Sequence, residues 1–318
     1  ALVIEHLYAV AFINGALLTF FDVAAAAYVP SLVGRERLVE ANSKLSASEA
    51  VVETTAFSIG GWVVQIFSAM VAVVVDAFSF LISGMLIWGI RKPEAAPTSG
   101  PAEGTAIREI SEGLQVVWSN PLLRAVTGST VAEGLAFGVV SATILIFGVR
   151  ELGISSGVLG TIFAVGGISS FLGASWASRV TRRFGFGPAI IGGFLLFSLG
   201  LLLLPAARGP VLAAGGILVM QQFFDAAWTV FQVNQMSLRQ AVTPDRLLGR
   251  ANASLRFLGM GSLFLGSLLG GALAEAIGLR VTLLVAAGTA LLGAAWLAFS
   301  PLRTLRELPI SPKIDATD

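Results

Sequence analysis

The chain has 318 residues, of which 55% are hydrophobic and only 12% are charged, and its mean hydropathy is +0.85. A soluble domain carries about 25% charged residues, so this composition excludes an ordinary soluble globule and predicts a membrane protein. The net charge of +1 points to no particular partner. The absence of cysteine excludes disulfides, thiolate catalysis and cysteine metal ligands.

Apolar runs separated by Gly, Pro and basic clusters predict nine membrane-spanning helices, because about 20 apolar residues suffice to cross a bilayer. The first 20 residues lack a basic flank and contain Glu5, His6 and Asn14, so we interpret them as a spanning helix rather than a cleaved signal peptide. We therefore expect an all-α polytopic membrane protein. The predicted spans are 2–29, 45–67, 70–90, 122–149, 158–180, 188–206, 211–236, 253–277 and 281–300.

One long polar interval, 91–120, separates the first three spans from the last six. Its first part, 93–105, is rich in Pro, Ala, Gly and Ser, as a flexible linker is. Its second part, 107–118, has the periodicity of a short amphipathic helix at a membrane surface. The predicted domains are a partial N-terminal half (1–90), a cytoplasmic linker (91–120), a C-terminal six-helix half (121–302) and a cytoplasmic tail (303–318).

Basic residues are distributed unequally between the predicted loops. If successive loops alternate sides of the membrane, all 20 lysines and arginines except Arg150, Arg208 and Arg280 fall on the same side. Positively charged loops remain in the cytoplasm. We therefore predict a protein of the inner (plasma) membrane with its C-terminus in the cytoplasm and its first residue outside, as an odd number of spans requires.

Two parts of the chain repeat the same landmarks in the same order. They are Phe20-Phe21-Asp22, Asn42 and Gly60-Gly61, and then Phe223-Phe224-Asp225, Asn252 and Gly270-Gly271. The interval from the asparagine to the second glycine is 19 residues in both copies. We infer an internal duplication in which the first three spans correspond to the last three. Spans four to six then lack a partner copy, so we predict an ancestor of two six-helix halves, with three further helices before Ala1.

Several motifs carry a family resemblance. They are the run from Phe20-Phe21-Asp22 through Val29-Pro30-Ser31-Leu32-Val33 to Arg35–Asn42, the segment Arg108–Gly113 followed by Asn120-Pro121-Leu122-Leu123-Arg124, and the loop Gly173–Gly185 with Arg179, Arg182 and Arg183. In these motifs the sequence resembles the major facilitator superfamily, in the branch that contains macrolide efflux pumps and enterobactin exporters. The resemblance covers nearly the whole chain and implies nine of the twelve transmembrane helices of the major facilitator fold.

One motif departs from the family pattern. The antiporter signature of helix five ends in Gly-Pro-x-x-Gly-Gly, whereas this chain has Ala56-Phe57-Ser58-Ile59-Gly60-Gly61. The later copy, Gly266–Gly271, also lacks the proline. The paired glycines still allow helices to approach closely. Because the proline is missing, the direction of transport that the resemblance implies stays open.

Four carboxyl groups are predicted inside the membrane, where a charge costs between about 2.5 and more than 10 kcal/mol. Glu53 and Glu133 are predicted near the midplane, and Asp22 and Asp225 in the cytoplasmic half. Glu133 is our first candidate for a proton carrier, because Gly134 and Gly138 beside it permit close helix approach. The alternative for each group is a structural carboxyl that is protonated or bonded to a neighbouring helix.

A polar stripe is predicted in the seventh span. Gln221, Asp225, Trp228, Gln232 and Gln235 are spaced 4, 3, 4 and 3 and would lie on one face of a single helix. Polar groups facing lipid would remain unpaired, so the stripe must face protein or water. In the family that the chain resembles, this helix lines the central cavity. The alternative is hydrogen bonding between helices alone.

Other chemistry finds little support in the sequence. Gly153-Ile154-Ser155-Ser156-Gly157 matches a nucleophile pattern, but it is predicted in a short loop between helices, without the strand–turn–helix context of that pattern. The sole histidine, His6, has no Cys or His companion for a metal site. No Gly-x4-Gly-Lys-Ser/Thr loop occurs. We therefore expect no enzyme, metal, cofactor or ATP-driven pump.

The sequence is best interpreted as a secondary active transporter that moves small amphipathic molecules by alternating access, as proton-coupled efflux. The candidate substrate-binding or proton-coupling residues are Glu133, Glu53, Asp225, Asp22, Gln221, Trp228, Gln232 and Gln235. The candidate conformational residues are Gly60, Gly61, Gly270, Gly271, Arg179, Arg182 and Arg183. We expect a monomer whose partners are a small-molecule substrate, protons and the lipid bilayer, with no nucleic acid. A polytopic enzyme acting on lipid and a truncated chain without transport activity stay open as alternatives.

Overall fold

The structure of the protein is a computed structural model, which describes residues 9–18, 20–21, 48, 52, 55–56, 58–90, 115, 117–243 and 245–307, with backbone alone at 240 and 245–250. Within this part the chain is helical apart from short connections. Seven helical segments among the described residues are long and apolar enough to cross a membrane. The predicted all-α membrane fold is therefore confirmed.

The chain divides into two compact units, one formed by residues 1–53 and 73–101 and the other by 54–72 and 102–318. Between 9 and 90 the structure describes a short apolar helix, Ala9–Leu18, a helical stretch at 58–66, and α3 (Ala69–Trp88). No side chain of α3 is buried. Glu53, Asp22 and Asn42 lie outside the described residues, so the superposition of the two repeats and the domain boundaries stay predictions.

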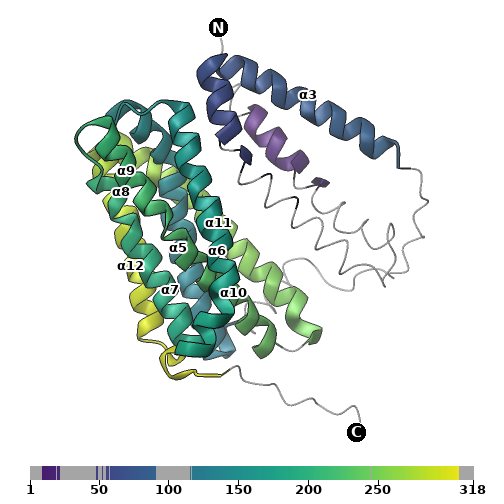
Figure 1. Cartoon of the computed structure of the whole chain (residues 1–318). Coiled ribbons are helices and arrows are strands. Elements are labelled where there is room, and N and C mark those ends of the chain that lie inside the picture. Colours follow the sequence, from purple (N-terminus) through teal and green to yellow (C-terminus); the bar gives the residue numbers. More distant parts are fainter. Residues whose placement is uncertain are drawn as a thin grey trace. The chain divides into compact units, whose positions relative to one another are not determined.

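The second unit contains the six spans expected from residue 121 onward (Figure 1). Its long helices α5, α6, α7 and α12 run side by side in the bundle. In chain order, the elements are α5 (Pro121–Ile146), the π-helix η2 (Phe147–Glu151), α6 (Ser156–Phe184), α7 (Phe186–Leu201), α8 (Leu203–Ala206), α9 (Val211–Gln222), α10 (Asp225–Val242), α11 (Asp245–Ile277), α12 (Leu279–Ala298) and the short 3-10 helix η3 (Pro301–Thr304).

Local sequence explains several helix ends. Asn120 precedes α5, and its Oδ1 accepts hydrogen bonds from the backbone N–H of Leu122 at 2.9 Å and of Leu123 at 3.4 Å. An asparagine N-cap followed by proline at the first helical position is a favoured start, because the cap satisfies donors that have no partner within the helix. Gly185 and Gly278 have φ of 93° and 82° and make one-residue connections between helices, which a side chain at that φ would strain.

The core of the second unit lies between α5, α7, α10 and α12. Phe194 and Phe231 are fully buried, and their rings are stacked with centroids 4.7 Å apart. Large apolar side chains also cover the outside of the bundle, for example Phe171, Trp176 and Leu212, which are more than half exposed. This distribution is expected for a bundle in lipid, where the exterior is as apolar as the interior.

Glycines bring the second half of α5 into backbone contact with residues 259–270 of α11. A Cβ on Gly134 would lie 2.8 Å from the carbonyl oxygen of Gly259, and one on Gly138 would collide with the carbonyl of Leu263. On the facing helix, Gly266 and Gly270 lie against the backbone of Leu135 and Val139. Small residues allow membrane helices to pack this closely. We call these four glycines and their contacts the α5–α11 seam.

Arg280 joins several elements at one end of the bundle. Its Nε lies 3.0 Å from Glu151 Oε2, and its Nη1 donates to the carbonyl oxygens of Pro205 at 2.9 Å and Ala207 at 2.8 Å. The guanidinium also lies 5.0 Å from the centre of the Phe147 ring. A planar group with several donors is suited to such a junction. This end of the unit, where η2 ends and α6, α9 and α12 begin, is opposite the end that carries Arg182 and Arg183.

Candidate functional site

Glu133 lies in the middle of α5 and bonds to two side chains of α10. Its Oε1 accepts hydrogen bonds from Trp228 Nε1 and, at 3.1 Å, from Gln232 Nε2. Glu133, Trp228 and Gln232 are all partly buried. The structure thus joins the candidate carboxyl of the fourth span to two residues of the polar stripe. Glu133 and Trp228 are 95 positions apart in sequence.

The bonds around Glu133 continue along α10. Gln235 Nε2 donates to Gln232 Oε1. The single hydroxyl hydrogen of Thr130 is shared between Gln235 Oε1, at 3.4 Å from its oxygen, and the carbonyl oxygen of Val126, at 3.1 Å. Each donor points along the chain toward Glu133. Hydrogen bonds linked in one direction polarise and strengthen one another, so this chain holds α5 and α10 together around Glu133. We call Thr130, Glu133, Trp228, Gln232 and Gln235 the Glu133 network.

The stripe lies on one membrane span, Val211–Arg239, as expected, but the regular α-helical hydrogen bonding of this span is interrupted at Phe223-Phe224. α9 ends at Gln222, α10 begins at Asp225, and Phe223-Phe224 form a turn between them. Ser169 of α6 explains the interruption, because its hydroxyl donates to the carbonyl of Phe223 at 3.0 Å and accepts from the N–H of Ala226 at 3.1 Å. A side chain inserted into the helical ladder in this way distorts the helix locally without a proline.

Asp225 lies at this interruption, in the first turn of α10. Gln221 lies one helical turn before Asp225, and its side chain is buried. A Cβ on Gly166 of α6 would lie 2.6 Å from Asp225 Oδ2, so the absence of a side chain there leaves room for the carboxyl. The amide of Gln222 donates to the carbonyl of Ile162 at 3.3 Å. The start of a helix favours a negative group, so Asp225 also has a local structural reason to occupy this position.

In each Gly-Gly pair, one glycine contacts a neighbouring helix and the other contacts no atom of the described chain. Gly61 lies against the backbone of α6. A Cβ on Gly270 would lie 2.9 Å from the Cα of Val139. A Cβ on Gly60 or on Gly271 would meet no atom of the described chain within 4 Å. Adjacent residues on a helix point about 100° apart, so one glycine of each pair faces a neighbour and the other does not.

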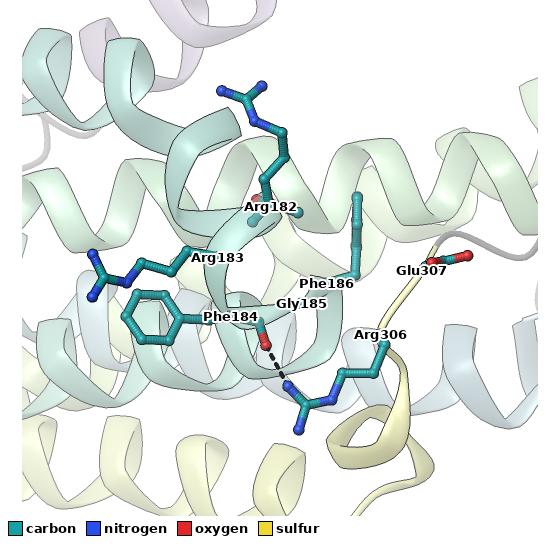
Figure 2. Close-up of a pocket in the computed structure, with 8 residues that line it drawn as sticks. Arg182, Arg183, Phe184, Gly185, Phe186, Arg306 and Glu307 are labelled. Atoms are coloured by element: carbon teal, nitrogen blue, oxygen red, sulfur yellow. Dashed lines mark hydrogen bonds between the residues drawn. The ribbon is translucent and has the colours of Figure 1, made fainter.

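The basic residues of the predicted loop surround a hollow of about 460 Å³ at the end of α6, lined by Thr181–Phe186, Arg306 and Glu307 (Figure 2). Arg306 Nη1 donates to the carbonyl of Phe184 at 2.9 Å, and the Arg183 guanidinium lies 5.8 Å from the centre of the Phe184 ring. Figure 2 shows Arg182, Arg183 and Arg306 pointing in different directions. They do not converge on one ligand, so this hollow is not a candidate substrate site. Arg179, like Arg182 and Arg183, is exposed.

Thr130 and Ser169 are site residues that the sequence did not single out. Hydroxyl side chains in membrane helices commonly bond to their own backbone, as Thr127, Thr143 and Ser198 do here. The sequence shows such residues but does not distinguish those that reach another helix. No group of three or more His, Cys, Asp or Glu side chains suited to a metal ion occurs in the part of the chain that the structure describes.

Comparison with known proteins decides the family. The sequence model described as Major Facilitator Superfamily matches residues 2–261. The chain belongs to the major facilitator superfamily. This confirms the resemblance seen in the sequence, and the superfamily is one of transporters rather than enzymes. The narrower branch of this superfamily stays a prediction.

Two curated relatives are transporters of the same superfamily from Bacillus subtilis (strain 168). YjbB, an uncharacterized MFS-type transporter, is 26% identical over 234 residues, which cover 71% of this chain and 55% of YjbB. YfiS, also an uncharacterized MFS-type transporter, is 28% identical over 276 residues, which cover 83% of this chain and 62% of YfiS. The chain therefore spans less than two thirds of the length of each relative.

Two solved structures share the fold. A bacterial homologue of the iron transporter ferroportin, in an inward-facing state, has a TM-score of 0.63 and 14% sequence identity, with 85% of this chain and 65% of that chain covered. A bacterial homologue of the human lysosomal transporter Spinster, inward-facing and unoccupied, has a TM-score of 0.53 and 17% identity, with 83% and 70% covered. At these identities the likeness shows the major facilitator fold alone.

Proposed function

We propose that the protein is a secondary active transporter that moves small amphipathic molecules across the inner membrane by alternating access, coupled to protons and directed outward. Membership of the major facilitator superfamily supports transport, and the likeness to two chains in inward-facing states supports alternating access. The substrate class and the outward direction rest on the resemblance to macrolide efflux pumps and enterobactin exporters. The orientation, with the C-terminus in the cytoplasm, rests on the distribution of basic residues.

The Glu133 network is the observation that carries the proposed coupling. Both donors use Oε1 of Glu133, and Oε2 has no hydrogen-bond partner among the described residues. No basic side chain in the described part forms an ion pair with Glu133. An ionisable group within a membrane span normally has a partner charge or serves an ion pathway. Since no partner charge is described here, we assign Glu133 the coupling proton, with Oε2 as the oxygen that takes it up.

Asp225 is the second candidate for the coupling proton, and the interruption of its helix is the reason. Transporters often place ion and substrate groups where a membrane helix departs from regular α-helical hydrogen bonding. Trp228, one turn further along α10, bonds to Glu133, so the two carboxyl groups flank the same helical segment. Asp22 and Glu53, which the sequence also predicted, remain candidates outside the described residues.

Substitutions in proteoliposomes test this proposal. A panel of amphipathic dyes and macrolides is first screened with the unaltered protein for a probe that accumulates under an imposed proton gradient. Glu133→Gln keeps the shape of the side chain but cannot ionise, so we expect gradient-driven accumulation to fall to the level of protein-free liposomes. Exchange of the same probe without a gradient should persist, because substrate contacts remain.

The matched control is Glu275→Gln, which neutralises an exposed carboxyl on α11 and should leave coupling unchanged. Asp225→Asn and Glu53→Gln are measured in parallel. If all three candidate substitutions leave coupled transport unchanged, none of these groups carries the proton, and the Glu133 network is then a structural link between α5 and α10. If no probe accumulates with the unaltered protein, the alternative of a chain without transport activity is favoured.

A further inference from the structure

The helical stretch 58–66 lies directly against the beginning of α6. A Cβ on Gly61 would lie 2.5 Å from the carbonyl oxygen of Ser156 and 3.2 Å from the Cα of Gly160. From the other side, a Cβ on Gly157 would lie 2.5 Å from Gln65 Oε1 and 2.8 Å from Cδ2 of the Trp62 ring. The two backbones therefore touch at a position where only glycines fit.

Two hydrogen bonds join the helices at this point. The backbone N–H of Gly157 donates to Gln65 Oε1 at 2.8 Å, and Trp62 Nε1 donates to Thr161 Oγ1 at 3.1 Å. Trp62 and Gln65 are three residues apart and so lie on the same face of their helix. We call Gly61, Trp62 and Gln65 with Gly157, Gly160 and Thr161 the α6-start contact.

Gln65 takes the place of a missing cap on α6. The first N–H groups of a helix have no acceptor within the helix and are normally satisfied by a side chain at the N-cap. Ser155 is the N-cap residue of α6, but its side chain makes no capping hydrogen bond. Gly157 is the second residue of α6, and its N–H is satisfied by Gln65, more than 90 positions earlier in the chain. The start of α6 is therefore completed by another helix.

The stretch 58–66 precedes the polar interval 91–120 and α6 follows it, so the contact joins the two predicted halves. It lies at the end of α6 opposite Arg182 and Arg183. We propose that the α6-start contact closes one side of the transport pathway, and that Gln65 holds it closed by capping α6 until alternating access requires it to break.

The contact has the properties of one that forms and breaks. It covers about one helical turn, and Trp62 is 41% exposed, so the contact is not enclosed by the rest of the described chain. A single hydrogen bond of this kind changes a two-state population by about three- to tenfold. This is enough for the contact to favour one state without locking the protein in it.

The capping role predicts opposite effects for two substitutions at Gln65. Gln65→Leu removes the acceptor while keeping most of the volume, so the closed state should lose population by about three- to tenfold. Gln65→Glu keeps an acceptor and adds negative charge at the positive end of the α6 dipole, so it should increase the closed population. If Gln65 only filled space, the two substitutions would not change the closed population in opposite directions. Trp62→Phe, which keeps an aromatic ring but removes the N–H, should act as Gln65→Leu does.

Spin-label distances measure these populations directly. The 318 residues contain no cysteine, so labels at Ile66→Cys and Leu212→Cys report only on the introduced sites. Both positions are exposed, at 65% and 91%, and neither belongs to the contact. In lipid nanodiscs, we expect Gln65→Leu and Trp62→Phe to increase the longer-distance population and Gln65→Glu to decrease it. The control Trp176→Phe, an exposed tryptophan further along α6, should change nothing.

A cross-link provides the second measurement. A Trp62→Cys and Thr161→Cys pair, oxidised to a disulfide, should stop exchange of a transported probe across proteoliposomes, and reduction should restore it. The proposal is overturned if the cross-linked protein exchanges the probe as fast as the same protein after reduction of the disulfide. It is also overturned if Gln65→Leu and Gln65→Glu give identical distance distributions.

This inference rests on the proposed alternating access, but its distance measurement needs neither a substrate nor a proton gradient. Suppose that Glu133→Gln loses coupling while the Gln65 variants leave the label distances unchanged. This result would support the proposed coupling and contradict the proposed role of the α6-start contact. Shifted distances in the Gln65 variants together with intact coupling in Glu133→Gln would do the reverse.

Discussion

The α5–α11 seam and the α6-start contact both depend on glycine, yet their surroundings differ. In the seam, Gly134, Gly138, Gly266 and Gly270 hold two backbones together over several turns of helix. In the α6-start contact the close approach covers about one turn, and hydrogen bonds from Trp62 and to Gln65 hold it. The comparison teaches that glycine permits close approach in both places, while the length of the contact and its partners decide whether it is permanent.

The energetics of a membrane interior explain this difference. Helices in lipid associate through van der Waals contacts, which add up along a long seam, whereas an interhelical hydrogen bond contributes only about 0.6 to 2 kcal/mol. A long seam therefore fixes α5 relative to α11. A contact of one turn with two hydrogen bonds loses few interactions when the helices separate, so it can break as the two halves move. Three glycine substitutions test this comparison.

The largest effect is expected at the seam, from Gly138→Ala. The new Cβ would collide with the backbone carbonyl of Leu263 and lie 2.7 Å from the N of Ser267, and neither atom can move without displacing α11. Overfilling a tight contact usually costs about 1–3 kcal/mol, and contact with backbone on both sides predicts the upper end of that range or more. Thermal unfolding of the purified protein in detergent measures it. An unchanged melting temperature would show that the seam is looser than the structure indicates.

An intermediate and different effect is expected from Gly61→Ala in the α6-start contact. The added Cβ would lie 2.5 Å from the carbonyl of Ser156, so the two helices must separate. We expect the longer-distance population of the Ile66–Leu212 label pair to rise, while the melting temperature changes much less than in Gly138→Ala. If Gly61→Ala lowers the melting temperature as much as Gly138→Ala does, the two contacts are alike and the comparison fails.

The smallest effect is expected from Gly271→Ala, which serves as a control on α11. No atom of the described chain lies within 4 Å of a Cβ placed there, and alanine is a better helix former than glycine. A substitution away from tight contacts usually changes stability by less than about 0.5 kcal/mol. The melting temperature and the label distances should therefore match those of the unaltered protein. A large loss at Gly271 would mean that α11 has a further neighbour beyond the described residues.

Much of the fold was predictable because membrane spans are local features. The six expected spans from residue 121 onward all appear, with ends shifted by only a few residues, since uninterrupted apolar runs must be helical in lipid. The interruption at Phe223-Phe224 was not predictable. The sequence there has neither proline nor glycine, and the break depends on a hydroxyl from Ser169 in another helix.

The candidate site was predictable in its members and not in its connections. Polar residues stand out in apolar spans, so Glu133, Trp228 and Gln232 were all singled out from the sequence. Nothing in the sequence indicated that Glu133 bonds to Trp228 and Gln232 rather than to Asp225, or that Gln65 caps a helix of the other predicted half. Both facts depend on which faces of distant helices meet.

The sequence by itself determined the membrane class, the positions of the seven spans seen among the described residues, and the family, because composition, apolar run length and motifs are properties of neighbouring residues. The tertiary structure alone decided which glycine of each pair is in contact, where the α9–α10 helix is interrupted, and which donors reach Glu133. The physical reason is that hydrogen bonds and close backbone approach act over about 3 Å, between residues that may be 90 or more positions apart.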